Sequence, residues 1–330
     1  MRAYSRRLAA FAAAAAAAIA MLGLDPSLAQ SHYPDHPVAL IVPYGPGGVA
    51  DVGMRLLGDK LSSRLGQQFV IENKPGAGGI IAAQAGASAA PDGYTLLMTG
   101  NNTAIATALF NKLPFDVLND FASISTAAFF DLLIVTRTGS PLHSVQDLIK
   151  AAEANPGKLN IGTITPGSTQ NLAALLFDST TGIKATIVTF RTSSDMANAV
   201  MRGDVDVSFE FYAAVHGFLD AGKMLALAST GAKRTAYLPK IPTVIESGIK
   251  DYDVASWNGL SVPAKTPKDA IATLNEAMKA VIAEPDIQAK AQAVGMEMRW
   301  STPDDMTARM KADIARWGAV IAKAGIPKRD

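Results

Sequence analysis

Short runs of β-type residues alternate with helical patterns along almost the whole chain, and this alternation limits the fold more than any other feature. The β-type runs fall at residues 38–42, 69–72, 94–98, 132–136, 159–163, 185–190, 205–209 and 224–229. Between the first two runs, Met54, Leu57, Leu61 and Leu65 recur at helical spacing. Strands that alternate with helices form parallel sheets from β–α–β units. The sequence therefore predicts an α/β fold.

Capping residues and prolines predict where several helices begin and end. Side chains suited to a helix N-cap occur at Asp51, Ser168 and either Ser193 or Ser194. Glycines suited to a helix C-terminus occur at Gly66, Gly182 and Gly203. The last part of the chain is rich in helical patterns, at residues 267–283, 285–294 and 303–324. Each of these three begins with a proline, which fits the first turn of a helix.

The number of strands allows one large sheet or two smaller ones, and two features favour two. Each half of the chain begins with a strand that ends in a turn rich in glycine, serine or threonine, at residues 43–51 and 162–171. Residues 119–125 and 257–263 are candidates for strands that pass between two lobes. We therefore expect residues 30–130 with 257–330 to form lobe 1 and residues 131–256 to form lobe 2.

The first residues have the pattern of a secretory signal peptide. Three arginines precede an apolar run over residues 8–24, and residues 27–29 supply the small side chains that a signal peptidase needs. The alternative, a membrane anchor, fits less well because the run is short and rich in alanine. We expect residues 1–29 to be removed by cleavage before Gln30, which places the mature chain in the periplasm.

Composition excludes several classes of protein. Cysteine is absent, so disulfides, thiolate metal sites and cysteine nucleophiles are excluded. Without residues 1–29 the chain has 27 basic and 28 acidic residues, a formal charge of −1, and nothing indicates a nucleic-acid surface. The four histidines, His32, His36, His143 and His216, form neither a metal-binding pattern nor part of a Ser-His-Asp set. We predict no metal, no cofactor and no catalytic site.

A glycine-rich turn, IVPYGPGGVAD at residues 41–51, joins the first predicted strand to a helix. Residues 45–50 match the G-x-G-x-x-A variant of the dinucleotide fingerprint, and Glu72 lies where a ribose-binding acid would stand. However, Pro46 removes an N–H from the loop, and export separates the chain from cytoplasmic nicotinamide cofactors. The backbone N–H groups of such a loop hold a carboxylate as well as a phosphate. The loop therefore predicts an anion site that suits a carboxylate as well as a phosphate, with Asp51 as the N-cap of the helix.

Several longer segments carry a family resemblance. The chain resembles the substrate-binding proteins of tripartite tricarboxylate transporters, the Bug family, in YPDHPVALIVPYGPGGVAD, IENKPGAGGIIAAQ and PDGYTLLMTGNNTAI. The resemblance continues through AGKMLALASTGAKR, LPKIPTVIESG and WNGLSVPAKTP and covers nearly the whole mature chain. It implies a periplasmic-binding-protein (Venus flytrap) fold, with two doubly wound sheets joined by crossover strands. It also implies a cleft for a small carboxylate and transient contact with membrane transporter subunits.

The resemblance assigns roles to residues of the first lobe. Members of the family hold one ligand carboxylate through main-chain N–H groups, and that role falls here on Tyr44, Gly45, Gly47 and Gly48. A second glycine turn at residues 76–79 either packs beside the first or is a tight turn without ligand contact. Polar residues follow the third strand at Thr99, Asn101 and Asn102. Because such side chains project into the crevice of an open α/β sheet, we expect at least one of them to contact the ligand.

In the second lobe the chain departs from the family pattern. Ser168 and Thr169 open a helix, where they either cap it or offer N–H groups to a second carboxylate. Asn171 stands where members often carry a histidine, and its amide hydrogen-bonds but does not titrate. Arg191 follows a strand end and offers a planar fork for a carboxylate, which makes it our main candidate for charge recognition. Glu210 holds Arg191 or accepts a hydrogen bond from the ligand.

Together these features predict a monomeric solute-binding protein, not an enzyme, that closes its lobes on a small organic acid and delivers it to a transporter. The ligand class is open between di- or tricarboxylates and aromatic acids. Aromatic residues at Phe190, Phe209, Phe211 and Tyr212 indicate a ring-bearing acid, although aromatic residues in strands more often belong to the core. Two alternatives stay open: an exported enzyme that acts on a small carboxylate, and a ligand-binding sensor partner without its own transporter.

Overall fold

The computed structural model describes residues 33–250 and 252–329. Contacts divide the chain into two units, residues 1–35 and residues 36–330, and the helices and strands of the described residues lie in the second unit. The expected signal peptide and its cleavage site before Gln30 lie outside the described residues. None of the described helices has the length and apolar character needed to cross a bilayer.

The strands form one connected mixed sheet. They are β1 (Val38–Val42), β2 (Phe69–Asn73), β3 (Thr95–Gly100), β4 (Phe121–Arg137), β5 (Asn160–Ile164), β6 (Thr186–Phe190), β7 (Val207–Phe211), β8 (Met224–Ser229), β9 (Ala255–Pro263) and β10 (Glu297–Met298). Their order is β2-β1-β3-β9-β4-β7-β5-β6, and β8 and β10 also pair with β4. The expectation of purely parallel sheets is wrong, because β4 and β9 run antiparallel to their neighbours.

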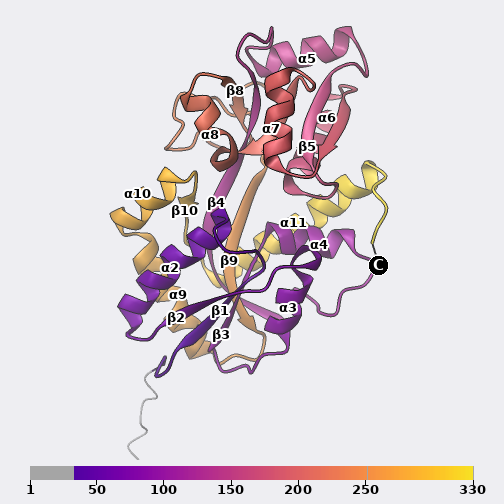
Figure 1. The fold of residues 1–330 in the computed structure, drawn as a ribbon. Coiled ribbons are helices and arrows are strands. Elements are labelled where there is room, and N and C mark those ends of the chain that lie inside the picture. Colours follow the sequence, from indigo (N-terminus) through magenta and orange to yellow (C-terminus); the bar gives the residue numbers. More distant parts are fainter. Residues whose placement is uncertain (1–32, 251, 330) are drawn as a thin grey trace, which may run out of the picture. The chain divides into compact units, whose positions relative to one another are not determined.

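Helices cover the strands in both halves of the sheet. They are α2 (Val49–Leu65), α3 (Ile80–Ala87), α4 (Asn101–Leu109), α5 (Val145–Ala154), α6 (Thr169–Thr181), α7 (Ser193–Arg202), α8 (Tyr212–Asp220), α9 (Lys268–Ile282), α10 (Pro285–Ala293) and α11 (Pro303–Lys323), with a short 3-10 turn η1 (Ala77–Gly79) before α3. Figure 1 shows α2 and α3 with β1 to β3 in the lower part of the view, and α5 to α8 with β5 and β8 in the upper part.

The long strand β4 connects these two halves. Its first part pairs antiparallel with β9, from Phe121 to Asp131, and its second part pairs antiparallel with β7 and β8. Figure 1 shows β4 and β9 side by side through the middle of the molecule. The predicted two-lobed α/β fold is thus confirmed, and the strands of its two halves belong to one connected sheet through β4. The predicted strand at residues 132–136 is only the second part of β4.

Glycines end three helices as predicted, whereas two predicted N-caps are wrong. Each of α2, α6 and α7 is followed by a glycine in the left-handed conformation, at Gly66, Gly182 and Gly203. Ser168 caps α6 as expected, since its hydroxyl accepts a hydrogen bond from Asn171 N at 3.1 Å. The N-cap of α7 is Thr192, which precedes the two predicted serines. The N-cap of α2 is Gly48, so Asp51 lies inside the first turn.

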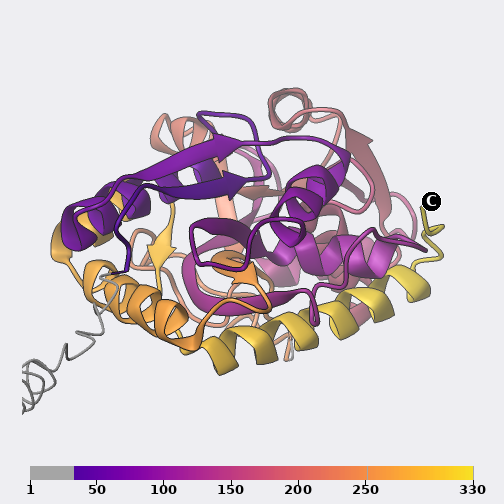
Figure 2. The same cartoon turned by 90° about the horizontal axis from the view of Figure 1, so that it is seen from below.

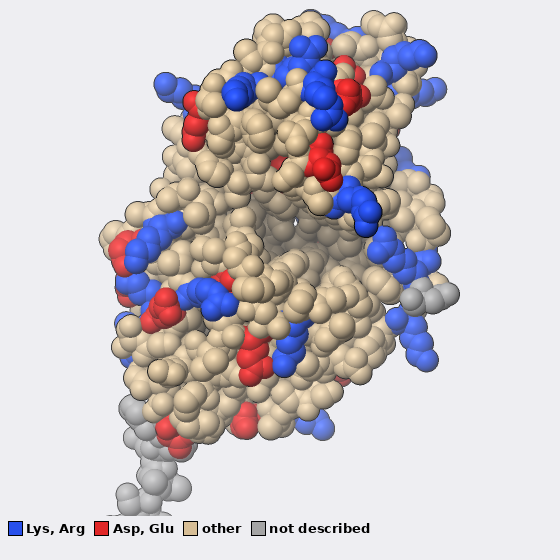
Figure 3. All heavy atoms as spheres, in the orientation of Figure 1, with Lys and Arg blue, Asp and Glu red and all other residues tan. Residues whose placement is uncertain are grey.

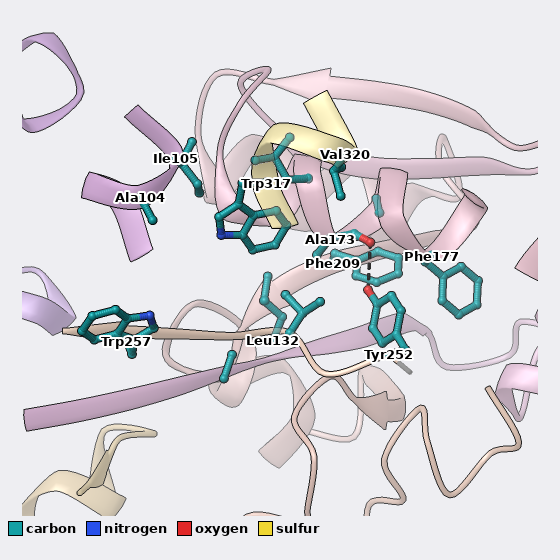
Figure 4. Packing of buried hydrophobic residues seen from close by; sticks show 14 of the residues in the cluster. Ala104, Ile105, Leu132, Ala173, Phe177, Phe209, Tyr252, Trp257, Trp317 and Val320 are labelled. Atoms are coloured by element: carbon teal, nitrogen blue, oxygen red, sulfur yellow. Dashed lines mark hydrogen bonds between the residues drawn. The ribbon is translucent and has the colours of Figure 1, made fainter. Parts of the chain in front are cut away.

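The C-terminal helix α11 ties the two halves together through the core. Trp317 of α11 is fully buried, and its indole N–H donates to Asn101 Oδ1 of α4 at 2.7 Å. Figure 4 shows Trp317 beside Ala104 and Ile105 of α4, with Tyr252 bonded to the carbonyl of Ala173 in α6. Figure 2 shows α11 as the long yellow helix along one edge of the view. Buried tryptophan and tyrosine thereby satisfy their polar groups, as core packing requires.

Candidate functional site

A cavity of about 830 Å³ opens between loops of the two halves of the sheet. Figure 3 shows a hollow in the middle of the molecule whose walls are mostly uncharged, with blue cationic side chains beside its right-hand rim. Among the predicted site residues, Tyr44, Gly45, Gly48, Ser168 and Thr169 line the cavity. Within residues 33–250 and 252–329, no group of histidine and acidic side chains could hold a metal ion.

The N-termini of several helices meet at this cavity. Its lining includes Gly48, Val49 and Ala50 at the start of α2, Gly76, Gly78 and Gly79 before α3, Asn102 at the start of α4, and Ser168, Thr169 and Gln170 at the start of α6. The first N–H groups of a helix have no partner within the helix. Together with the helix dipole, they favour an anion. The convergence of these N-termini therefore favours a negatively charged group in the cavity.

The loop before α2 is held by Asp51, which is 1% exposed. Its Oδ2 accepts hydrogen bonds from Gly47 N at 2.8 Å and Arg55 Nε at 2.9 Å, and its Oδ1 accepts one from Asn73 Nδ2 at 2.8 Å. Burial raises the pKa of Asp51, but these hydrogen bonds outweigh it and lower the pKa below its ordinary value. Asp51 therefore fixes the shape of the loop. Asp51 does not cap the helix, because the backbone N–H group that donates to it belongs to Gly47, which precedes the helix.

The loop before α6 repeats this arrangement. Gly167 N donates to Asn171 Oδ1 at 3.1 Å, as Gly47 N donates to Asp51, and both glycines have positive φ angles, 80° and 85°. The two segments, PGGVAD and PGSTQN, both begin with Pro-Gly and end in Asp or Asn four residues after the glycine. Asn171 is buried and also donates to Thr163 Oγ1 at 3.3 Å. Two similarly built loops therefore present helix N-termini to one cavity, from the two halves of the sheet.

The three polar residues predicted to follow the third strand lie in different places, with Thr99 inside β3 and Asn101 and Asn102 in the first turn of α4. Thr99 is buried and bonded to Ser261 Oγ at 2.8 Å, outside the cavity lining. Asn101 is 0% exposed, and its Nδ2 donates to Thr169 Oγ1 at 2.9 Å while its Oδ1 accepts from Trp317. Only Asn102 lines the cavity, and its buried Oδ1 has no hydrogen-bond partner among the described residues. Asn101 therefore joins α4, α6 and α11, and Asn102 offers a free acceptor to a ligand or water.

The remaining predicted residues lie outside the lining. Gly47 and Asn171 are engaged in their loops, and Arg191 is exposed just beyond the end of β6. Glu210 is 1% exposed, and its Oε1 accepts from Gln170 Nε2 at 2.9 Å instead of holding Arg191. Burial raises the pKa of Glu210. Glu210 therefore orients Gln170, which lines the cavity. The ligand-binding roles assigned to these residues stay predictions.

Sequence reasoning did not single out several lining residues. They include Gln170, Phe130, Ser256, Asn258 and Arg329. Gln170 had a local signal, since it follows the predicted contacts Ser168 and Thr169 directly. Arg329 had none, because its position depends on backbone pairing of the C-terminal segment with the end of α4, where Arg329 N donates to Leu109 O at 2.9 Å.

Replacing Asp51 by alanine should loosen the loop before α2. We expect a loss of about 2 kcal/mol in the free energy of unfolding at neutral pH, since three hydrogen bonds to a charged acceptor disappear. Because the folded-state pKa is lowered, this stabilisation is present above pH of about 4 and is lost as the pH falls through the folded pKa. Urea denaturation at neutral and acid pH measures both effects.

The control is Asp59→Ala, which removes an exposed acid from the same helix. This variant should change the free energy of unfolding by less than about 0.5 kcal/mol. Equal losses in the two variants would contradict the role assigned to Asp51.

Comparisons with known proteins agree with this geometry. The sequence matches the family model described as tripartite tricarboxylate transporter family receptor over residues 54–326. Protein BugT of Bordetella pertussis is 30% identical over 309 residues, which cover 93% of this chain and 95% of BugT. Among solved structures, R. palustris Rpa4515 with adipate is 33% identical, with a TM-score of 0.76 over 90% of this chain and 100% of that chain. MatC from Rhodopseudomonas palustris with bound malate is 28% identical, with a TM-score of 0.71 over 88% of this chain and 100% of MatC.

Proposed function

Because the chain belongs to the tripartite tricarboxylate transporter receptor family, we propose that it is a solute-binding protein that captures a small organic carboxylate in the cavity. The observation that carries the proposal is the convergence of the N-termini of α2, α4 and α6 on one cavity with an almost uncharged lining. Unpaired N–H groups at these positions favour an anion. The similar proteins solved with adipate and with malate point to a carboxylate as that anion.

The two similar loops, before α2 and before α6, bind the ligand one after the other. The ligand first meets the loop before α2 in lobe 1, which we place at residues 30–130 and 257–330. Movement of lobe 2, residues 131–256, then brings Ser168 and Thr169 onto the ligand. Arg191 joins the site only if this closure carries it from its exposed position to the cavity rim. Closure requires that the ligand bind the closed state more tightly than the open one.

The protein would carry out this role as an exported monomer. In the proposed cycle, the mature chain begins at Gln30 in the periplasm, closes on its ligand without chemical change, and delivers it to a membrane transporter. The buried charge of Asp51 suits this role, because Arg55 and Asn73 engage the carboxylate and turn it away from a bound anion. The neutral Asn171 occupies the equivalent position in the second loop.

A thermal-shift screen of the purified protein with adipate, malate, citrate and benzoate tests the proposal. A ligand that binds only the folded state raises the melting temperature, by about 5 °C at roughly a hundredfold excess over its Kd. We expect at least one of these acids to do so, while the matching uncharged amide does not. If every acid leaves the melting temperature unchanged, the proposed function is wrong.

Ser168→Asp locates the ligand within the cavity. Aspartate caps a helix as well as serine does, so the fold should keep its stability. The new carboxylate would repel a bound anion, and we expect the affinity for the acid found in the screen to fall at least about tenfold. The control is Ser144→Asp at the N-cap of α5, which lies outside the cavity lining. Equal affinities of the two variants would show that the ligand does not lie at the start of α6.

A further inference from the structure

Helix α4 crosses the cavity with a polar start and an apolar remainder. Asn102, Ile105, Ala106 and Leu109 line the cavity, and their spacing places them on one face of the helix. With a rise of about 1.5 Å per residue, this face extends over about 10 Å. A ligand lying along α4 therefore meets one amide and then only hydrocarbon.

Aromatic and aliphatic residues from three strands also line the cavity. Phe130 of β4 and Phe211 at the end of β7 line the cavity, with their rings packed edge to face at a centroid distance of 6.4 Å. Ile164 at the end of β5 also lines the cavity. A small acid that carries polar groups on every carbon would leave these surfaces in water, whereas a hydrocarbon segment would bury them, at about 25 cal/mol per Å².

The two ends of α4 differ in what they offer to an anion. At its start, Asn102 lies against the turn before α3, so close that a Cβ at Gly79 would be 2.9 Å from Asn102 Nδ2. The same Cβ would be 3.4 Å from Pro43 Cβ, so the loop before α2 lies there as well. At its other end, Leu109 packs against the loop before α6, where a Cβ at Gly167 would be 2.8 Å from Leu109 Cδ2. The N-termini of α2 and α4 therefore lie at one end of this face, about 10 Å from Leu109, and the loop before α6 packs at the other end.

Arg329 supplies a cation at the second end. Its backbone is fixed there, because Arg329 N donates to Leu109 O at 2.9 Å and its carbonyl accepts from Asn111 N at 2.8 Å. Its side chain has one hydrogen bond within the described residues, from Nη2 to Pro166 O at 3.0 Å. Of the described residues that line the cavity, it alone carries a charge. A guanidinium has five N–H donors, so most of them are available to a second anion.

We propose that the ligand is an extended dicarboxylate with an apolar chain between its two carboxylates. One carboxylate lies at the N-termini of α2 and α4, the chain follows the apolar face of α4, and the second carboxylate pairs with Arg329. An arginine fork binds a carboxylate through two parallel hydrogen bonds, which makes Arg329 the residue that distinguishes a dicarboxylate from a monocarboxylate. This inference rests on the proposed function and names the ligand class of the same site.

Calorimetric titration of the purified protein measures this preference. The probes are adipate, suberate and sebacate, each compared with the monocarboxylate of equal chain length, and citrate as a compact polar acid. We expect the best dicarboxylate to bind at least about tenfold more tightly than its monocarboxylate partner and than citrate. In Arg329→Gln this advantage should disappear, with the affinity for the monocarboxylate unchanged. Arg329→Lys, which keeps the charge but loses the fork, should retain part of it.

The control is Lys328→Gln, which removes the same charge one residue earlier, outside the cavity lining. It should keep the preference for the dicarboxylate. A loss of affinity in Arg329→Gln that is equal for both acids, or tighter binding of citrate by the unaltered protein, would overturn the inference and leave the proposed function intact. If none of the acids binds, the proposed function fails, and the inference fails with it.

Discussion

Replacing Gly100 by alanine should lower the free energy of unfolding by at least about 3 kcal/mol. Gly100 ends β3 and precedes α4, and it pairs with Asn258 of β9. A Cβ at this position would lie 2.1 Å from the carbonyl oxygen of Trp257 and 3.1 Å from Asn258 Cα. These are backbone atoms of the neighbouring strand, so no side-chain rotation relieves the contact. The sheet would have to separate at its centre.

Urea denaturation of the Gly100→Ala variant measures this loss. The control is Gly318→Ala in α11, where a Cβ would meet nothing within 4 Å and the φ angle is not positive. That substitution should stabilise the protein by about 0.5–1 kcal/mol, because alanine is the better helix former. If Gly100→Ala unfolds at the urea concentration of the unaltered protein, β3 and β9 are not packed as closely as the structure has them.

Gly100 also illustrates what the sequence could and could not predict of the fold. Local patterns predicted β1 and β8 to the residue and the C-termini of α2, α6 and α7, because alternation and glycine caps are local signals. The first part of β4 was predicted only as a candidate strand between the lobes at residues 119–125, since most of its residues are buried on both faces and polar residues do not alternate with apolar ones. The need for glycine at Gly100 depends on β9, a strand far along the chain.

The candidate site, too, could be predicted from the sequence only in part. The glycine-rich starts of α2 and α6 were visible as motifs, but no pattern in the sequence connected Asp51 with Asn171. The structure shows that both accept a hydrogen bond from the glycine four residues earlier. Which of Asn101 and Asn102 faces the cavity depends on Trp317, which engages Asn101 from a helix near the C-terminus. Such long-range contacts leave no local pattern.

Asp131 provides the second large effect, a dependence of stability on pH. It lies in β4 opposite Ala255 of β9 and is 5% exposed. Its Oδ2 is buried without a hydrogen-bond partner among the described residues, against Gly231, where a Cβ would lie 2.2 Å from that oxygen. Burial raises the pKa of Asp131 from 3.8 to about 7, and the charge of Arg299 only partly opposes the shift.

The direction of the effect follows from the two pKa values. The folded protein binds the proton more tightly than the unfolded chain, so the stabilisation is complete below the unfolded pKa of 3.8. It is lost as the pH rises through the folded pKa of about 7. At about 1.4 kcal/mol for each unit of pKa difference, the loss between pH 4 and pH 8 is on the order of 4 kcal/mol.

Asp131→Asn should therefore remove this part of the pH dependence. Asparagine keeps the size of the side chain and does not titrate, so the variant should lose less stability than the unaltered protein between pH 4 and pH 8. Urea denaturation at several pH values in that range measures the difference between the two curves, which we expect to grow to a few kcal/mol at pH 8. The control Glu276→Gln, at an exposed position of α9, should follow the curve of the unaltered protein. Parallel curves for Asp131→Asn and the unaltered protein would mean that Asp131 is already ionised in the folded state near pH 4, because solvent or an arginine reaches the carboxylate.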